Sequence, residues 1–524
     1  MPQNEEKRHL PNQPESYWLD KSILPDYPAL STHIDVDVII VGAGITGITS
    51  AYLLANEGFN VAILEAGKAL NGTTGHTTAK VTAQHGLIYN GLIQNVGEQM
   101  ASLYYQANAD ALSFMRKTIG QLDISCDFLE QDAFIYSTTE QYARTLEKEA
   151  EAYSLLGIDG ELVASIPFNL DIQNALVMRN QAQFHPVKYL SRLLEASIEK
   201  GASLFERTTA VNIQPGERPT VFTRDGATAT ADYVLLCSHF PFYEGTGLYS
   251  TRLHADRSYV IAAKTKKDYP GGMYISAEQP TRSLRSLSMD GESYVLIGGE
   301  SHKAGQGGDT LKCYEALEAF GEDVFGLEAI PYRWSAQDLI TLDNIPYIGS
   351  ITSGHDNLLI ATGYRKWGMT NGTAAALLFK DMVLKKESKY ETLFSPSRFH
   401  MNPSLKNVLM ENANVAGHLL KGKLEMPETQ LNDLSLDEGA VMMINGHRKG
   451  VYKDSGGKLH MVDTTCTHIG CEVEWNNGER TWDCPCHGSR FSITGEVIEG
   501  PAEKPLQQYD YTMLDNLTSD DSGY

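Results

Sequence analysis

The stretch VDVIIVGAGITG, residues 36–47, decides the fold of the N-terminal part of the chain. Its first six residues are mostly apolar and β-branched, which predicts a buried strand, and the small and apolar residues after Gly47 predict a helix. A second apolar run, Val61 to Leu64, ends at Glu65. Strand, helix and strand in this order predict a βαβ unit with a glycine-rich turn after its first strand.

The glycine-rich turn has the spacing that binds the phosphates of a dinucleotide. Its first glycine permits the tight turn, the second lets a pyrophosphate approach the backbone, and the third lets the helix pack on the sheet. The helix N-terminus offers N–H donors to phosphate, and Glu65 can accept from ribose hydroxyls. A tight turn without a ligand is the alternative, and the pattern does not distinguish FAD from NAD. The candidate residues of this unit are Gly42, Gly44, Ile45, Thr46, Gly47 and Glu65.

The 524 residues are too many for one hydrophobic core and predict several domains. Helical patterns occur at 98–120, 138–156, 186–200 and 368–384, a mixed β-rich region at 203–300, and an apolar strand at 358–361. The segment 385–430 has the composition of a linker, with a helical pattern at 404–421. From about residue 431, short strands and turns predict a small all-β domain.

The net charge of −23 would repel nucleic acid and anionic lipid, which excludes both as partners. The N-terminus has polar and acidic residues where a secretory signal needs an apolar run, and no run approaches 18 apolar residues. We therefore expect a cytoplasmic protein without stable membrane insertion.

Four of the seven cysteines lie between Cys466 and Cys486, which indicates a metal site. Cys466-Thr467-His468 and Cys484-Pro485-Cys486-His487 are separated by fifteen residues. Two cysteines and two histidines at such spacing also bind zinc, but a zinc knuckle does not explain the additional cysteines at 471 and 486.

The strings CTHIGC, residues 466–471, and CPCHGS, residues 484–489, closely resemble the Rieske iron–sulfur signature. The resemblance implies a [2Fe–2S] cluster with one iron on Cys466 and Cys484 and the other on His468 and His487. It also implies a disulfide between Cys471 and Cys486. Gly500-Pro501-Ala502 resembles the proline loop that covers the cluster. Ser489 matches a position whose hydroxyl donates to a cluster sulfide, and Phe491 stands where respiratory relatives have a tyrosine.

The remaining motifs resemble the D-amino-acid-oxidase superfamily, near glycine oxidases and D-amino-acid dehydrogenases. NGTTGHTT, residues 71–78, resembles its second flavin-binding loop, and 343–349 with 363–370 resemble the segment that returns to the flavin ring. The resemblance implies bound FAD. It adds these cofactor-binding candidates: Thr74, Gly75, His76, Thr77, Thr78, Gly363, Gly368, Met369 and Thr370.

The chain as a whole resembles the bacterial YhfW-type proteins, a flavin domain followed by a Rieske domain. We expect an α/β FAD-binding Rossmann-like domain with an α+β substrate domain, then a small all-β Rieske domain. The expected divisions are an arm (1–34), the oxidoreductase (35–385), a linker (386–430), the Rieske domain (431–513) and an acidic tail (514–524). Within the oxidoreductase, FAD-binding segments span about 35–85, 185–240 and 335–385, and substrate-domain segments span about 86–184 and 241–334.

Amine oxidation by a flavin needs a neutral amine over the ring and a cation for a substrate carboxylate. Tyr274, Arg285 and Lys366 align with substrate-facing positions of the superfamily, and Lys80 follows the second flavin loop, where it could stabilise reduced flavin. For Lys80 a structural salt bridge is the alternative, and for the others an ordinary structural or surface role.

The sequence predicts an FAD-dependent dehydrogenase that oxidises a CH–NH or CH–NH2 group of an amine or amino-acid-like substrate. Electrons would pass singly through the cluster to an external acceptor, a small redox protein or a quinone. Two alternatives are a reductase with reversed electron flow and a non-enzymatic redox sensor.

Overall fold

The computed structural model describes residues 10–22, 24–398, 412–419, 422, 427 and 429–509. The chain divides into two compact units. The first comprises Met1–Leu253, Ser258–Ser301 and Tyr314–Leu405, and the second His254–Arg257, His302–Cys313 and Lys406–Tyr524. Residues 1–9 of the expected arm, 404–411 of the expected linker helix and the whole acidic tail lie outside the described residues.

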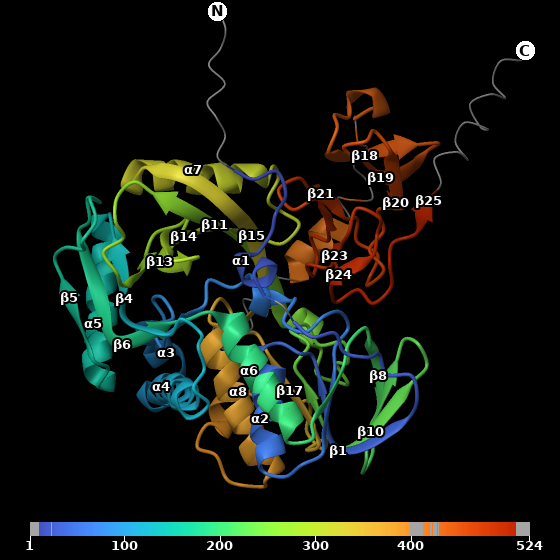
Figure 1. The fold of residues 1–524 in the computed structure, drawn as a ribbon, viewed down its shortest axis with the longest axis horizontal. Helices are drawn as coiled ribbons and strands as arrows, with labels where there is room; N and C mark the ends of the chain where they lie inside the picture. The colour runs from blue at the N-terminus through green and yellow to red at the C-terminus, as the bar shows by residue number, and fades with distance from the viewer. Residues whose placement is uncertain are drawn as a thin grey trace, which may run out of the picture. The chain divides into compact units, whose positions relative to one another are not determined.

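The first unit contains an eight-stranded sheet built on the predicted βαβ unit (Figure 1). Strands β17, β10, β1, β2 and β7 run parallel, β16 and β9 join them antiparallel, and β8 pairs with β9. Helix α2 (Ile45–Asn56) connects β1 to β2 and packs against α6 (Pro186–Glu199) and α8 (Gly368–Val383). The strands are β1 (Ile34–Val41), β2 (Val61–Leu64), β7 (Ser203–Phe205), β8 (Ala210–Gln214), β9 (Thr220–Thr223), β10 (Thr228–Leu236), β16 (Tyr347–Ser350) and β17 (Leu358–Thr362).

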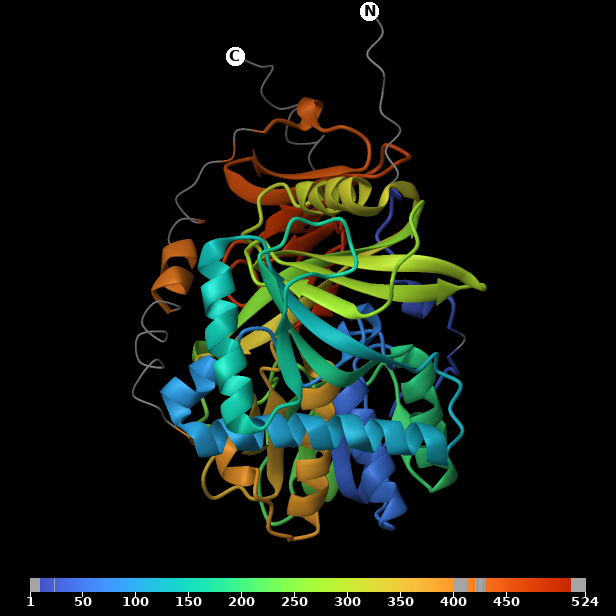
Figure 2. The same ribbon diagram turned by 90° about the vertical axis from the view of Figure 1, so that its left-hand side faces the viewer.

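A second, mixed sheet of nine strands follows the order β15-β11-β14-β13-β12-β4-β6-β3, with β5 beside β6. The strands are β3 (Lys80–Val81), β4 (Leu129–Ser137), β5 (Gly160–Val163), β6 (Asn174–Gln183), β11 (Leu253–Thr265), β12 (Met273–Ser276), β13 (Arg282–Met289), β14 (Glu292–Lys303) and β15 (Leu327–Thr341). Figure 2 shows the long helix α4 and helix α5 beside this part of the chain. The helices are α3 (Tyr89–Val96), α4 (Glu98–Gln121), α5 (Glu140–Leu156), α7 (Leu311–Phe325) and α9 (Glu391–Phe394), with short 3-10 turns η1 (Thr73–His76) and η2 (Tyr249–Thr251). Together the two sheets confirm the α/β and α+β fold expected for the oxidoreductase.

The N-terminal arm contributes to the hydrophobic core, which its polar sequence did not predict. Helix α1 (Tyr17–Asp20) buries Tyr17 and Trp18 in the main core of the first unit. The Trp18 indole donates to the Thr77 carbonyl at 2.7 Å, and the Ser16 hydroxyl donates to the Gly75 carbonyl at 2.5 Å. The arm therefore holds the loop that was predicted to bind flavin.

The second unit contains two antiparallel four-stranded sheets, which confirms the small all-β domain. Its core is centred on Val462, Trp482 and Phe491. Residues 412–419 are helical, and Val415 and Leu419 pack against this core. The sheets are β18 (Glu438–Ile444), β19 (His447–Lys453), β20 (Leu459–Asp463) and β25 (Gln508–Tyr509), and β21 (Glu474–Asn476), β22 (Thr481–Asp483), β23 (Arg490–Phe491) and β24 (Val497–Glu499); a 3-10 turn, η3 (Leu431–Asp433), precedes them. Across the described part of the chain, no helix is both long and apolar enough to span a bilayer.

Candidate functional site

The glycine-rich turn connects β1 to α2 and depends on two of its glycines. Gly42 has a φ of 109°, and a Cβ there would lie 2.5 Å from the Cys237 carbonyl oxygen. A Cβ on Gly47 would overlap the carbonyl oxygen of Gly42. At Gly44 a Cβ would meet only the Thr74 hydroxyl, at 3.1 Å. The turn is thus as tight as the phosphate-binding role requires.

Glu65 lies at the end of β2, beside this turn. Its carboxylate accepts from the Ala43 N–H at 2.8 Å and from the Gly67 N–H at 2.9 Å. Burial raises the pKa of Glu65, and the two N–H donors oppose that rise. The acidic residue is therefore fixed at the edge of the turn, where a ribose would lie.

The predicted second flavin loop meets the start of α2. The Thr74 hydroxyl, in η1, accepts from the Ile45 N–H at 3.1 Å, and the Thr46 hydroxyl bonds to the Tyr364 hydroxyl at 2.8 Å. His76 Nδ1 lies 2.9 Å from the Gly72 carbonyl oxygen, and the Thr77 hydroxyl accepts from the Ala79 N–H at 3.0 Å. The turn, Thr74 and Thr46 therefore lie together, while Gly75, Thr77 and Thr78 line the same loop.

The start of α8 lies beside a buried histidine. Gly363 has a φ of 78°, and Gly368, Met369 and Thr370 form the first turn of α8. His85 Nε2 lies 2.8 Å from the Thr82 carbonyl and 3.0 Å from the Thr370 hydroxyl, and Nδ1 lies 2.7 Å from the Tyr104 hydroxyl.

Burial lowers the pKa of His85 to about 3, so the ring is neutral. Because Nε2 faces a carbonyl, Nε2 carries the proton and Nδ1 accepts from Tyr104. The Trp367 ring stacks on His85 at 4.9 Å, which fixes the loop before α8.

Lys80 lies on β3, directly after the second flavin loop. Its ammonium donates to the Tyr274 carbonyl at 2.7 Å and to the Ser283 hydroxyl at 2.8 Å. Burial, helped by the charge of Arg285, lowers the pKa of Lys80 to about 7. No carboxylate is among these described partners, and the role of Lys80 beside the flavin stays a prediction.

Arg285 is buried and holds the backbone around the second flavin loop. Its guanidinium donates to the carbonyls of Thr78 and Ala79 at 3.0 Å, and to those of Phe184 and Ser286 at 3.2 and 2.9 Å. Burial lowers the pKa of Arg285 to about 9. These bonds are structural, and a contact between Arg285 and substrate stays a prediction.

Tyr274 and Lys366 lie in different surroundings. Tyr274 is buried on β12 and stacks on Phe134 with ring centroids 4.7 Å apart, and burial raises the pKa of its hydroxyl. Lys366 is exposed in the loop between β17 and α8. The substrate roles of both residues stay predictions.

The two cysteine–histidine loops of the second unit have the same backbone design. In residues 466–471, the Cys466 N–H donates to the Cys471 carbonyl at 2.7 Å and the Gly470 N–H to the Cys466 carbonyl at 3.0 Å. In residues 484–489, the Cys484 N–H donates to the Ser489 carbonyl at 2.8 Å. The Gly488 N–H donates to the Cys484 carbonyl at 3.1 Å. Gly470 and Gly488 have φ values of 84° and 78°, which favour glycine. Each loop is thus a closed turn that begins with a buried thiol.

The two thiols and the two imidazoles lie close together. Cys466 and Cys484 are buried and hydrogen-bonded to each other, and the bond from Cys484 lowers the pKa of Cys466 to about 7. The His468 and His487 rings are 5.1 Å apart, and burial lowers the pKa of both, that of His487 to about 4. Among the described residues, nothing bonds to the buried His487 Nδ1.

The bond between Cys466 and Cys484, together with burial, raises the pKa of Cys484. Neutral imidazoles and a close pair of cysteine sulfurs are the donors a Rieske cluster needs, so these four residues fit the group. Each thiol also receives backbone N–H bonds from its own loop: Cys466 from residues 468 and 469, and Cys484 from residues 486 and 487. Ser489 adds a side-chain bond to Cys466, and its hydroxyl accepts from the Ala502 N–H at 3.0 Å. Hydrogen bonds to sulfur stabilise the added negative charge of a reduced cluster.

Cys471 and Cys486 form a disulfide, as the resemblance implied. It joins the two loops, and its sulfurs lie within 4.8 Å of the Cys484 sulfur. Since both are consumed by the disulfide, they are not available as metal ligands. Gly500 and Pro501 precede Ala502, so the predicted proline loop lies beside Ser489.

The sequence did not predict that two segments of the oxidoreductase region belong to the second unit. Arg257 is fully buried, and its guanidinium lies 3.1 Å from Glu499 and 3.5 Å from Asp483, the residue before Cys484. Gln306 donates to the Pro485 carbonyl at 2.9 Å. Neither residue stands in a motif. The only local signal is Gly305, whose positive φ of 69° permits the close approach to Pro485.

Comparison with known proteins agrees with both sites. Residues 37–382 match the family of FAD dependent oxidoreductases, and residues 426–510 match the Rieske [2Fe-2S] domain. The chain is 51% identical over 497 residues to YhfW of Bacillus subtilis (strain 168), which is named as a Rieske 2Fe-2S iron-sulfur protein; the match covers 95% of this chain and 98% of that protein.

More distant relatives match the oxidoreductase region. Gamma-glutamylputrescine oxidoreductase of Escherichia coli (strain K12) is 22% identical, over 70% of this chain and 87% of its own length. Glycine oxidase of Geobacillus kaustophilus has the same fold, with a TM-score of 0.59 at 19% identity, over 70% of this chain and 99% of its own. FAD and a [2Fe–2S] cluster are thus the cofactors. The chain belongs to the family of FAD-dependent oxidoreductases, as a YhfW-type member that carries a C-terminal Rieske domain.

Proposed function

We propose that the protein is a dehydrogenase that oxidises an amine or amino-acid-like substrate and passes the electrons, one at a time, through the Rieske domain to an external acceptor. The observation that carries the proposal is the presence of both families in one chain, residues 37–382 and 426–510. When bound, FAD supplies a two-electron acceptor for a C–H hydride, and the cluster supplies a one-electron carrier.

Different residues of the first unit are proposed to bind different parts of FAD. The Gly42–Gly47 turn and Glu65 would hold the dinucleotide, and the loop 74–78 and the start of α8, including Gly363, would face the flavin. Partial positive charge at the N-terminus of α8 favours the negative charge that reduction builds nearby. The neutral His85 ring contacts the Thr82 carbonyl and the Thr370 hydroxyl, so it holds the start of α8 in place without adding charge.

Lys80 is proposed to hold and exchange a proton beside the flavin. Its pKa of about 7 lets the amine be charged or neutral near physiological pH, which suits either stabilisation of reduced flavin or positioning of a water. Tyr274, Arg285 and Lys366 remain the candidates for substrate contact. The names of glycine oxidase and gamma-glutamylputrescine oxidoreductase support a CH–NH or CH–NH2 group as the reacting centre.

In the second unit, Cys466 and Cys484 are proposed to hold one iron, and His468 and His487 the other. The paired buried thiols and the adjacent neutral imidazoles support this assignment. The acceptor is proposed to be a small redox protein or a quinone. Location in the cytoplasm stays a prediction.

Anaerobic screening of amines and amino acids tests the function directly. Each compound is mixed with holoprotein while flavin bleaching and the EPR signal of the reduced cluster are recorded. A substrate should bleach the flavin and produce the cluster signal in the same sample. A Cys484→Ser variant, which lacks a proposed iron ligand, serves as the control and should bleach without the signal. Bleaching in the holoprotein with an oxidised cluster would refute the relay.

Electron flow from the cluster to the flavin would require the opposite order of reduction potentials. A reductase would need a cluster potential below that of the flavin, whereas the dehydrogenase needs one at or above it. A redox titration of both centres in the same holoprotein distinguishes the two directions.

A further inference from the structure

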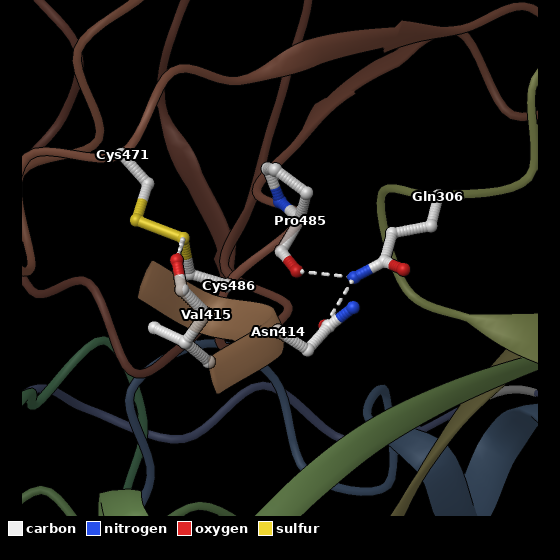
Figure 3. Close-up of a disulfide and its surroundings, with 6 residues drawn as sticks. All are labelled: Gln306, Asn414, Val415, Cys471, Pro485 and Cys486. Carbon is white, nitrogen blue, oxygen red and sulfur yellow. Dashed lines mark hydrogen bonds between the residues drawn. A yellow bond between two sulfur atoms is a disulfide. The ribbon is translucent and has the colours of Figure 1, made fainter. Parts of the chain in front are cut away.

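Gln306 is bonded to the peptide that follows a proposed iron ligand. It lies in the segment His302–Cys313, which belongs to the second unit. Its Nε2 donates to the Pro485 carbonyl at 2.9 Å and to Asn414 Oδ1 at 3.0 Å (Figure 3). Both partners are acceptors, so the amide nitrogen of Gln306 must face them.

The other end of the same peptide faces the ligand. The peptide between Pro485 and Cys486 has its N–H on Cys486, and this N–H donates to the Cys484 sulfur. A continuous chain of hydrogen bonds therefore runs from the Gln306 amide, through the carbonyl and N–H of one peptide, to the sulfur of Cys484. Each bond in such a chain polarises the next, by roughly 10–30% per bond.

The backbone around Gln306 holds it against the loop. Gly305 has a φ of 69°, and a Cβ there would lie 2.6 Å from the backbone of Pro485. Further along, the Thr310 hydroxyl donates to Asn476 Oδ1 at 2.6 Å and accepts from the Gly478 N–H at 2.9 Å. The segment is thus anchored on both sides of Gln306.

The second acceptor of Gln306 also reaches the loop. Asn414 lies in the helix at 412–419, and the carbonyl of the next residue, Val415, lies 3.9 Å from the Cys486 sulfur (Figure 3). Gln306 therefore joins three parts of the chain around the Cys484–Cys486 turn.

We propose that Gln306 is a positioning residue that raises the reduction potential of the cluster, by polarising the peptide whose N–H donates to Cys484. A stronger N–H donor withdraws electron density from the sulfur and stabilises the reduced state. The inference rests on the proposed ligand role of Cys484, but it needs neither a substrate nor a direction of electron flow.

The test is a redox titration of full-length holoprotein, followed by the EPR signal of the reduced cluster. Gln306→Leu removes the donor and should lower the reduction equilibrium constant roughly two- to threefold, which is about 18–28 mV for a one-electron couple. Resonance Raman spectra should show an Fe–S(Cys) stretch at higher frequency, since the sulfur then donates more strongly to iron.

Asn477→Ala is the matched control. Asn477 bonds to Asp309 and Thr310 of the same segment, at 2.5 and 2.8 Å, and neither of these bonds involves the Pro485 carbonyl. It should leave the potential and the Raman band unchanged. An equal shift in this control would show that general loosening, rather than the hydrogen-bond chain, sets the potential, and would overturn the proposal.

The remaining outcomes are also decisive. An unchanged potential in Gln306→Leu with a full complement of iron refutes the proposal. If that variant loses its iron, Gln306→Met, which keeps the length of the side chain, is titrated instead, and loss of iron there too would make Gln306 an assembly residue and overturn the proposal. Zinc in the wild-type protein would refute the ligand assignment itself, which is a separate failure.

Discussion

Replacing Lys80 with methionine should change how stability depends on pH. The Lys80 amine is buried without a carboxylate among its described partners, and burial lowers its pKa from the ordinary 10.5 to about 7. A difference of one in pKa corresponds to about 1.4 kcal/mol. Holding the charged amine at pH 6 therefore costs the folded state about 5 kcal/mol.

The direction in which wild-type stability changes with pH depends on whether the folded or the unfolded chain binds the Lys80 proton. Between pH 7 and 10.5 the unfolded chain binds this proton and the folded chain does not, so wild-type stability rises with pH. At pH 9.5 only about 1.4 kcal/mol of the cost remains. Lys80→Met also loses two hydrogen bonds, to Tyr274 and Ser283, worth about 1–3 kcal/mol together.

The variant should therefore be more stable than wild type at pH 6, by about 2–4 kcal/mol, and this advantage should shrink by about 3 kcal/mol at pH 9.5. Urea unfolding at saturating FAD, followed by the release of flavin fluorescence, measures the difference. Lys117→Met, an exposed lysine on α4, is the matched control and should follow wild type at both values of pH. If the unfolding free energies of wild type and Lys80→Met changed with pH in the same way, the lowered pKa of the buried Lys80 amine would be refuted.

Three further variants test the two sites. Gly47→Ala should abolish FAD binding, because its Cβ would overlap the Gly42 carbonyl, and the flavin content of purified protein measures this. Replacing both disulfide cysteines with serine opens a link between residues 15 apart and should cost about 3 kcal/mol, seen as iron loss at lower urea than in wild type. Ser489→Ala removes a hydrogen bond to Cys466 and should lower the cluster potential at constant iron content; an unchanged potential would contradict the bond.

Local patterns predicted the elements that position both sites. The βαβ unit, the helices α4, α5, α6 and α8, and the strand β17 agree with the predicted ranges to within two residues, because each rests on a continuous periodic stretch. The loops 466–471 and 484–489 were recognisable because they resemble the Rieske signature, and the matching backbone bonds of the two turns agree with that resemblance.

Long-range packing was not predictable from these patterns. Tyr17 and Trp18 stand in a polar arm, and only the tertiary structure supplies the Thr77 carbonyl that the Trp18 indole needs. Arg257 and Gln306 lie within ordinary strand and turn sequences, yet they contact residues more than 170 positions away. Likewise, nothing in its sequence surroundings indicated that the guanidinium of Arg285 binds backbone carbonyls.

Electron transfer between the flavin and the cluster can be measured without any substrate. Bound flavin is photoreduced anaerobically in holoprotein at several protein concentrations, and samples are frozen over time for EPR. If electrons pass between the two centres of one chain, the cluster signal grows as the flavin is reoxidised, at a rate independent of protein concentration. A cluster that stays oxidised, or a rate that scales with protein concentration, would contradict transfer within one chain.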